Sequence, residues 1–350
     1  MSILLNIHEP WHYSNWEPVL RHLEPGEAQV WVTPWLHRGP DLVSQQRAQA
    51  RTVGWLERQS IPYLTGDLSY FPHVLATLAI EERLVPIDQS RQVRMLYAVI
   101  SKRYTYSELN RICDRVMVAS DFGRKLMERH RVRADVVGYP KLDDVFNGVL
   151  TRETVRQRFG LDPNRKLVLY APTFDKLCSV ERFAAAFDGL DPSIDLLVQL
   201  HPVSYVKELD RFAELGPRFG WVPEEHAGIA ALIAADLVVT DYSGVTFEAC
   251  AADIPIVLLD DPELEPSDDV EMVHRDVGPR VSDPAGLKDA VEEELTRPER
   301  WATQRAYYRE TFFDHRGTAG PRAAEVLREL ELEAHEARRE AVAQSIGLTV

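Results

Sequence analysis

Short apolar runs alternate with amphipathic stretches over most of the chain. Each run is too short for a buried helix and ends at polar or turn-forming residues, which predicts a buried strand. The stretches between the runs carry apolar residues at helical spacing. Strands are predicted at 3–7, 29–33, 115–119, 135–137, 167–170, 195–200, 237–240 and 256–259. Helices are predicted at 16–23, 45–59, 121–130, 152–159, 180–187, 205–215, 229–234, 245–252 and 286–295.

Strands and helices alternate in two series, a pattern typical of parallel βαβ units. We therefore predict an α/β protein with two Rossmann-like domains that face a central cleft. The boundary lies near 145–151, so the domains cover 1–148 and 149–318. A chain of 350 residues is long enough for two cores of ordinary size. In such sheets ligands bind beyond the carboxyl ends of the strands.

The tail, 319–350, is rich in Ala, Glu, Arg and Leu. From Pro321 to about Gln344 it is predicted to form one long helix. Its apolar stripe consists of Val326, Leu327, Leu330 and Leu332. We expect this stripe to pack back on the body of the protein. A helix that lies on a membrane surface would carry a Lys/Arg-rich polar face, whereas this face carries both signs of charge.

The composition is 45% hydrophobic and 27% charged, with a formal net charge of -15. This charge disfavours nucleic-acid partners, which long-range electrostatics would repel. No apolar run approaches the ~20 residues that span a bilayer, and the first residues lack the basic segment of a signal peptide. Cys113, Cys178 and Cys250 form no CxxC pair, which disfavours zinc and disulfides. A cytoplasmic location fits these features best.

The strand predicted at 237–240 is followed by a turn of small, hydroxyl-bearing residues and then by a helix. The turn contains Ser243, Gly244 and Thr246, and Glu248 falls within the first turns of the helix. A helix N-terminus presents backbone N–H groups and a positive dipole end, which favours a bound phosphate. Glu248 is placed to reach a ribose on such a phosphate. The alternative is that Ser243 merely caps the helix.

Two more strand ends in the second series carry chemistry. Thr173 follows the strand at 167–170, and His201 follows the strand at 195–200. Each has a structural alternative, since Pro172 and Pro202 terminate strands and a histidine at a strand end is often a structural hydrogen-bonding group. Their occurrence at successive strand ends favours a nucleotide site at one edge of the sheet.

Several short motifs, taken in order, resemble the CDP-glycerol glycerophosphotransferase family, whose members have the GT-B fold and are teichoic-acid polymerase-like. The resemblance covers the second half of the chain well and the first half thinly. The matching segments are Ile7–Ser14, Gly138–Asp143, Tyr170–Phe174, His201–Pro202, Thr240–Gly244 with Glu248, and Phe313–Gly317 with Arg322.

The resemblance implies transfer of glycerol phosphate or ribitol phosphate from a CDP-alcohol to a hydroxyl of a cell-wall or surface glycopolymer, with release of CMP. In that chemistry fixed hydrogen-bond donors stabilise the charge that grows on the phosphates. Thr173 and the turn Ser243–Thr246 would bind the pyrophosphate, and His201 would donate a hydrogen bond to it. Glu248 would accept hydrogen bonds from the ribose hydroxyls. Neither a cofactor nor a metal is implied. The resemblance adds peripheral association with the inner face of the cell membrane as an alternative location.

The family's His-Gly-Thr-Pro-Leu-Lys segment, whose histidine is taken to activate the acceptor, is missing. The corresponding region is Val85–Gln92, which contains Asp88 but no histidine. His8, Glu9 and His12 follow the first strand, and we favour His8 or His12 as the catalytic base. The alternative is that this aromatic loop simply packs, with His12 on the surface.

Two further segments depart from the family pattern. Lys176 stands near the position of a family arginine, and the acceptor-side segment is not recognisable in Asp261–Asp276. Two other functions therefore stay open: a GT-B glycosyltransferase or UDP-N-acetylglucosamine 2-epimerase-like enzyme with an NDP-sugar, and a non-catalytic nucleotide-binding protein. Paired aspartates are interpreted as turns and caps rather than metal ligands; they are Asp143–Asp144, Asp260–Asp261 and Asp268–Asp269.

Overall fold

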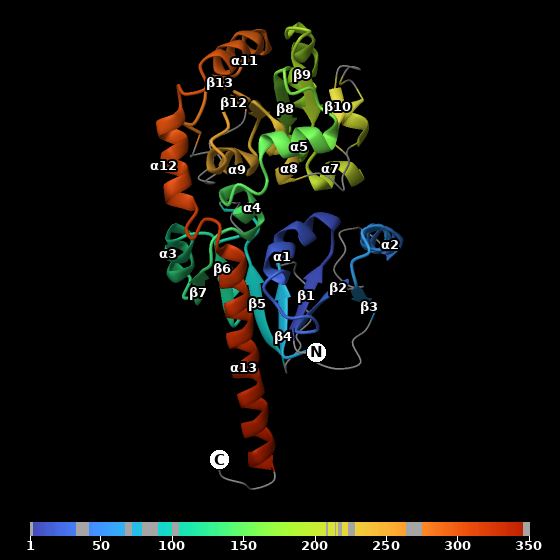
Figure 1. Cartoon of the computed structure of the whole chain (residues 1–350), viewed down its shortest axis with the longest axis vertical. Coiled ribbons are helices and arrows are strands. Elements are labelled where there is room, and N and C mark those ends of the chain that lie inside the picture. The colour runs from blue at the N-terminus through green and yellow to red at the C-terminus, as the bar shows by residue number, and fades with distance from the viewer. Residues whose placement is uncertain are drawn as a thin grey trace. The chain divides into compact units, whose positions relative to one another are not determined.

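The computed structural model describes residues 3–32, 42–66, 72–78, 90–99, 105–207, 209–213, 215, 219–222, 228–263 and 275–345. The chain forms two compact units (Figure 1). The first unit comprises Met1–Tyr97, Tyr106–Asp143 and Asp314–Val350, and the second comprises Ala98–Thr105 and Asp144–Phe313. The C-terminal segment therefore belongs with the N-terminal half of the chain.

The first unit is built on a parallel sheet with the strand order β3-β2-β1-β4-β5-β6-β7 among the described residues. The strands are β1 (Ile3–Ile7), β2 (Ala28–Val32), β3 (Tyr63–Thr65), β4 (Val74–Thr77), β5 (Arg91–Met95), β6 (Arg115–Val118) and β7 (Ala134–Val136). The helices are η1 (Pro10–His12), α1 (Tyr13–Leu20), α2 (Leu42–Arg58), η2 (Glu108–Ile112), α3 (Asp121–Arg129), η3 (Pro140–Leu142) and α13 (Ala319–Ser345). All five residues of β1 are buried, as expected for a central strand covered on both faces.

Helix α13 contributes to the core of the first unit. It packs against α1 and against strands β4 and β5 (Figure 1). Val326, Leu327 and Leu330 of the predicted stripe are buried there with Trp16 of α1. Leu332 is 66% exposed, so its place in the stripe was wrong. At 100° per residue the buried face continues from Leu330 to position 334 rather than to 332.

The second unit contains a parallel sheet with the order β10-β9-β8-β11-β12-β13 among the described residues. Its strands are β8 (Leu167–Ala171), β9 (Asp195–Val198), β10 (Phe219–Trp221), β11 (Leu237–Thr240), β12 (Ile256–Leu259) and β13 (Arg280–Val281). Its helices are α4 (Asp143–Phe146), α5 (Arg152–Phe159), η4 (Asp175–Leu177), α6 (Val180–Phe183), η5 (Ala184–Gly189), α7 (Pro202–Lys207), η6 (Leu209–Phe212), α8 (Ile229–Ala234), α9 (Val245–Ala251), η8 (Pro284–Gly286), α11 (Leu287–Thr296) and α12 (Ala302–Phe312). Strands β8 and β11 are wholly buried at its centre.

Several elements differ from those predicted. The helix predicted at 205–215 begins instead at Pro202 and is divided into α7 and η6. Proline is favoured in the first turn of a helix, so Pro202 starts a helix as well as ending the strand. The helix predicted at 180–187 is α-helical only to Phe183 and continues as η5. Strands β3, β4, β5, β10 and β13 and helix α12 were not predicted.

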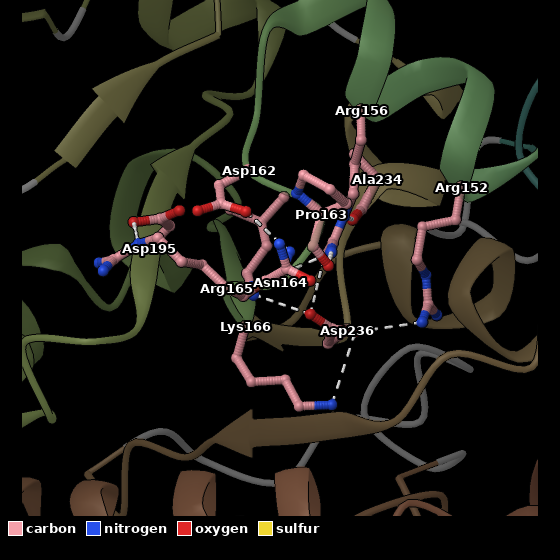
Figure 2. A network of polar contacts seen from close by, with 11 residues as sticks. Arg152, Arg156, Asp162, Pro163, Asn164, Arg165, Lys166, Asp195, Ala234 and Asp236 are labelled. Carbon is pink, nitrogen blue, oxygen red and sulfur yellow. Dashed lines mark hydrogen bonds and ion pairs between the residues drawn. The ribbon is translucent and has the colours of Figure 1, made fainter.

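A buried ion pair joins the starts of β8 and β11 in the second unit (Figure 2). Asp236, which precedes β11, accepts hydrogen bonds from Arg156 Nη2 at 2.6 Å and from the N–H of Leu167 at 2.8 Å. Arg156 Nε also donates to the carbonyl of Ala234 at 2.9 Å. Arg152 Nη1 donates to the second oxygen of Asp236 at 3.1 Å. This network fixes α5 against the edge of the sheet at which strands β8 and β11 begin.

Two segments of the first unit meet where the chain leaves that unit and returns. The carboxylate of Asp143 accepts the N–H groups of Ala319 at 3.1 Å and Gly320 at 2.6 Å, and so caps α13. Asp314 accepts the N–H of Asp121 at 2.7 Å at the start of α3. The interpretation of Asp143 as a cap is confirmed, and the motifs Gly138–Asp143 and Phe313–Gly317 contribute to this junction.

We expect Gly138→Ala to destabilise the protein by roughly 2–4 kcal/mol, measured by urea unfolding. Gly138 has φ +96°, and a Cβ there would lie 2.8 Å from the carbonyl oxygen of Asp314 and from the Cβ of Ala319. Gly148→Ala is the matched control, because Gly148 also has a positive φ (+67°) but, apart from its chain neighbours, no atom of the described residues lies within 4 Å of its would-be Cβ. Equal losses for the two variants would contradict the packing argument.

Candidate functional site

Three neighbouring strands of the second unit end in the residues singled out from the sequence. β8 lies between β9 and β11, with Tyr170 opposite Val198 and Ala171 opposite Thr240. Because all these strands are parallel, their carboxyl ends share one edge of the sheet. The segments that begin with Thr173, His201 and Asp241 therefore leave that edge side by side.

Asp241 connects two of these segments. Its carboxylate is completely buried and accepts hydrogen bonds from the N–H of Thr173 at 2.8 Å and from the N–H and hydroxyl of Ser179 at 2.9 and 2.8 Å. The phenol of Tyr170 lies 2.9 Å from the Ser179 hydroxyl. Burial raises the pKa of Asp241 to about 6, against the opposing effect of these hydrogen bonds. The loop after β8 is thus held to the end of β11.

His201 lies half-buried at the end of β9 and directly precedes α7. Its ring packs on Phe174 with centroids 4.3 Å apart. Its Nδ1 accepts the N–H of Val203 at 3.2 Å, which leaves the proton of the neutral ring on Nε2. The ring is therefore oriented by two neighbours, with the proton of its neutral form on Nε2.

The turn after β11 leads directly into α9. The N-cap of α9 is Gly244, and no side-chain hydrogen bond caps the helix there. The alternative in which Ser243 is the N-cap was therefore wrong. The hydrogen bond that the Ser243 hydroxyl accepts from the N–H of Val245 is long, 3.4 Å. Ser243 is 9% and Thr246 3% exposed, and Glu248 is half-buried in the first turn of α9.

Arg275 contacts the same strand ends, although the sequence analysis did not single it out. Its guanidinium donates to the carbonyls of Asp241 at 2.7 Å and Leu259 at 3.0 Å, and to the Asp260 carboxylate at 2.5 Å. Ser179 was missed as well. Neither residue lies in a recognisable motif, and both reach the site only through the fold.

His8 and His12 are in the first unit, at the end of β1 and in η1. They are 2% and 3% exposed, so the part of the alternative that placed His12 on the surface was wrong, although the aromatic loop does pack, with Trp11 against His12 and Tyr97. His12 Nδ1 accepts the N–H of His8 at 3.2 Å, and His8 Nε2 lies 3.3 Å from the side-chain amide of Asn6. Thr52 donates to the His8 carbonyl at 2.8 Å. The two rings form an ordered pair with centroids 5.5 Å apart.

Other residues named from the sequence have simpler roles or lie outside the described part. Glu9 pairs with Arg51, and Lys176 is exposed in η4. Asp260 pairs with Arg275 and Arg280, each at 2.5 Å. Asp88, Asp268 and Asp269 are outside the described residues.

Groups of three or more acidic, His or Cys side chains placed to bind a metal ion do not occur within the described ranges. Burial raises the pKa of Cys113 to about 11 and of Cys178 to about 12, so neither is a reactive thiolate.

In the part of the chain that the structure covers, no helix is long and apolar enough to cross a membrane.

The chain is similar to known proteins in sequence and in structure. A family model for CDP-Glycerol:Poly(glycerophosphate) glycerophosphotransferase matches residues 85–328. The teichoic acid glycerol-phosphate primase of Bacillus spizizenii is 28% identical over 156 residues, which are 41% of this chain and 39% of that protein. The match therefore spans less than half the length of this curated relative.

Solved structures share the fold over nearly the whole chain. The wall teichoic acid polymerase TagF superposes with a TM-score of 0.63 at 13% identity, covering 96% of this chain and 90% of that chain. UDP-GlcNAc 2-epimerase from Neisseria meningitidis gives a TM-score of 0.60 at 12% identity, covering 95% and 100%. At these identities the similarity establishes the fold, and it confirms the predicted α/β, GT-B class.

Proposed function

The chain belongs to the CDP-glycerol:poly(glycerophosphate) glycerophosphotransferase family, and from this membership we propose a transferase. It moves glycerol phosphate, or a similar polyol phosphate, from a CDP-alcohol to a hydroxyl of a cell-wall or surface glycopolymer. The observation that carries the proposal is the extent of the family match, which includes Thr173, His201 and the Ser243–Glu248 turn. The three segments leave one edge of the second sheet, which supports a single binding site for the CDP-alcohol.

In the proposed reaction the acceptor oxygen forms a bond to the β-phosphorus of the CDP-alcohol. The bond from that phosphorus to the oxygen bridging it to the α-phosphorus breaks, and CMP leaves with the bridging oxygen. The acceptor proton passes to a base. Negative charge grows on the phosphate oxygens, so hydrogen-bond donors fixed beforehand lower the barrier.

The second unit supplies residues for the nucleotide in this proposal. His201 Nε2 donates to the pyrophosphate, together with the hydroxyls of Thr173, Ser243 and Thr246 and the Gly244 backbone. The N–H of Thr173 is engaged by Asp241, so only its hydroxyl is assigned this role. Glu248, in the first turn of α9, accepts the ribose hydroxyls.

The first unit supplies the base for the acceptor in this proposal, and His8 and His12 are the candidates. The N–H of His8 engages Nδ1 of His12, so the proton of a neutral His12 ring lies on Nε2. In the same way, the Asn6 side-chain NH2 engages Nε2 of His8 at 3.3 Å, so the proton of a neutral His8 ring lies on Nδ1. His8→Gln and His12→Gln separate the roles, because only loss of the base removes the acidic limb of the pH profile of kcat/KM.

We expect CDP and CMP to raise the melting temperature, and UDP, GDP and ADP to raise it far less. A ligand at about 100 times its Kd stabilises the native state by about 2.7 kcal/mol, which thermal unfolding detects. The same shift is expected with EDTA and with magnesium, because the proposed site uses dipoles and side-chain donors rather than a metal.

The other outcomes of this experiment point to different functions. A shift confined to UDP would contradict the CDP-alcohol and indicate an NDP-sugar enzyme. The absence of a shift with every nucleotide would favour a protein without this activity. A shift that requires magnesium would place a metal in the site.

A further inference from the structure

We propose that Arg275 is a positioning residue that sets the affinity for the CDP-alcohol, an inference that rests on the proposed function. It does so by holding the two nucleotide-binding loops, defined here as 172–179 after β8 and 241–246 after β11. Arg275 itself is assigned no contact with substrate. The assignment follows from four contacts that the guanidinium makes at the ends of β11 and β12.

The guanidinium joins the ends of two strands. One terminal nitrogen, Nη1, donates to the carbonyl of Asp241 at 2.7 Å. The other, Nη2, donates to the carbonyl of Leu259 at 3.0 Å and to the Asp260 carboxylate at 2.5 Å. The guanidinium also lies over the Tyr242 ring, 4.3 Å from its centroid. Arg275 therefore fixes the main chain where the loop 241–246 begins.

The same contact reaches the second loop through Asp241. The side chain of Asp241 holds the N–H of Thr173 and both donors of Ser179, at 2.8 to 2.9 Å. Its main-chain carbonyl is held by Arg275. A displaced Asp241 backbone would carry its carboxylate with it and release the loop 172–179. Asp241 thus links both nucleotide-binding loops to Arg275.

The chemistry of this position favours arginine specifically. Arg275 is only 4% exposed, and Asp260 compensates its buried charge. A guanidinium presents several N–H groups in a rigid planar fork, so it bonds two carbonyls and a carboxylate at once. A lysine carries the same charge at one point and does not bridge these groups in the same way.

Arg280 provides a matched control. It pairs with the other oxygen of Asp260 at 2.5 Å, but its side chain is 60% exposed, and among the described residues Asp260 is the ion-pair partner of Arg280. Arg280→Met therefore removes a cation beside Asp260 while the contact between Arg275 and Asp241 remains. Gly138→Ala, in the first unit, controls for a general loss of stability.

The test compares full-length Arg275→Lys and Arg275→Met with these controls, well below their melting temperatures. We expect both variants to raise the calorimetric Kd for CDP at least about tenfold, because small displacements of binding groups are costly. KM for the CDP-alcohol rises in parallel while kcat changes less. Arg280→Met and Gly138→Ala stay within about twofold of wild type. Hydrogen exchange speeds up at the amides of Thr173, Ser179 and 243–246.

The following results would contradict the role proposed for Arg275. If wild type binds CDP and Arg275→Lys binds it equally well, the inference is overturned while the proposed function stands. Unchanged exchange in both loops of Arg275→Met also overturns it. Equal weakening in Gly138→Ala shows a merely structural effect and overturns it too. If wild type binds no cytidine nucleotide, the proposed function fails together with this inference.

Discussion

His201→Ala is expected to lower kcat/KM for the CDP-alcohol by about 100-fold or more. Removal of one preorganised hydrogen-bond donor to developing negative charge costs on the order of 100- to 1,000-fold in other enzymes. His201 has the features of such a donor, because the Val203 N–H engages Nδ1 and the Phe174 ring packs on the imidazole. The measurement is steady-state transfer to a glycopolymer acceptor, with release of CMP as the readout.

Stability should change little in the same variant. His201 is half-buried, and its packing on Phe174 is worth about 1 kcal/mol. His201→Gln keeps a side-chain N–H donor and should recover part of the rate. His22→Ala is the control, because His22 is an exposed residue of the first unit. A wild-type rate in His201→Ala would remove this residue from the site.

Asp236→Ala is expected to destabilise the protein by about 3–5 kcal/mol, because it leaves the buried Arg156 guanidinium without its carboxylate. The side chains of Arg156 and Asp236 are 7% and 11% exposed, and their closest atoms lie 2.6 Å apart (Figure 2). The variant also leaves the Leu167 N–H without its acceptor at the start of β8. Urea unfolding measures the loss.

Asp195→Ala is the matched control within the same group of residues (Figure 2). Asp195 pairs with Arg165 at 2.7 Å, but the two side chains are 32% and 39% exposed. An exposed pair of this kind contributes at most about 1 kcal/mol. A double variant, Arg156→Met with Asp236→Leu, should regain part of the lost stability because no buried charge remains. Similar losses for Asp195→Ala and Asp236→Ala would contradict the role of burial.

The best-predicted elements were those with strong local patterns. The strands at 237–240 and 256–259 and the helix at 152–159 have the bounds that the sequence predicted. The two strands are continuous apolar runs, and the helix begins at a capping box on Thr151. Both kinds of signal arise within a few residues of the chain, so a single sequence is enough to read them.

β4 was missed although its residues, Val-Leu-Ala-Thr, form a short apolar run, whereas β5 lacks such a signal. β5 reads Arg-Gln-Val-Arg-Met, with polar residues at three of its five positions. Its Arg94 is nevertheless 5% exposed, because it donates to Asn110 at 2.7 Å and to the Leu78 carbonyl at 3.1 Å. A buried arginine is compatible with a strand only when distant residues accept its hydrogen bonds. The sequence does not show which residues those are.

The parallel α/β class could be predicted from the amino-acid sequence, and so could the strand ends that carry Thr173, His201 and the Ser243 turn. These features depend on periodicity, turn chemistry and short motifs, all of which are local. By contrast, the position of β8 between β9 and β11 and the hydrogen bond from Arg275 to the Asp241 carbonyl became known only from the folded structure. The physical reason is that sheet neighbours and buried polar contacts join residues far apart in the chain. These contacts form only when the chain folds, so no local sequence pattern predicts them.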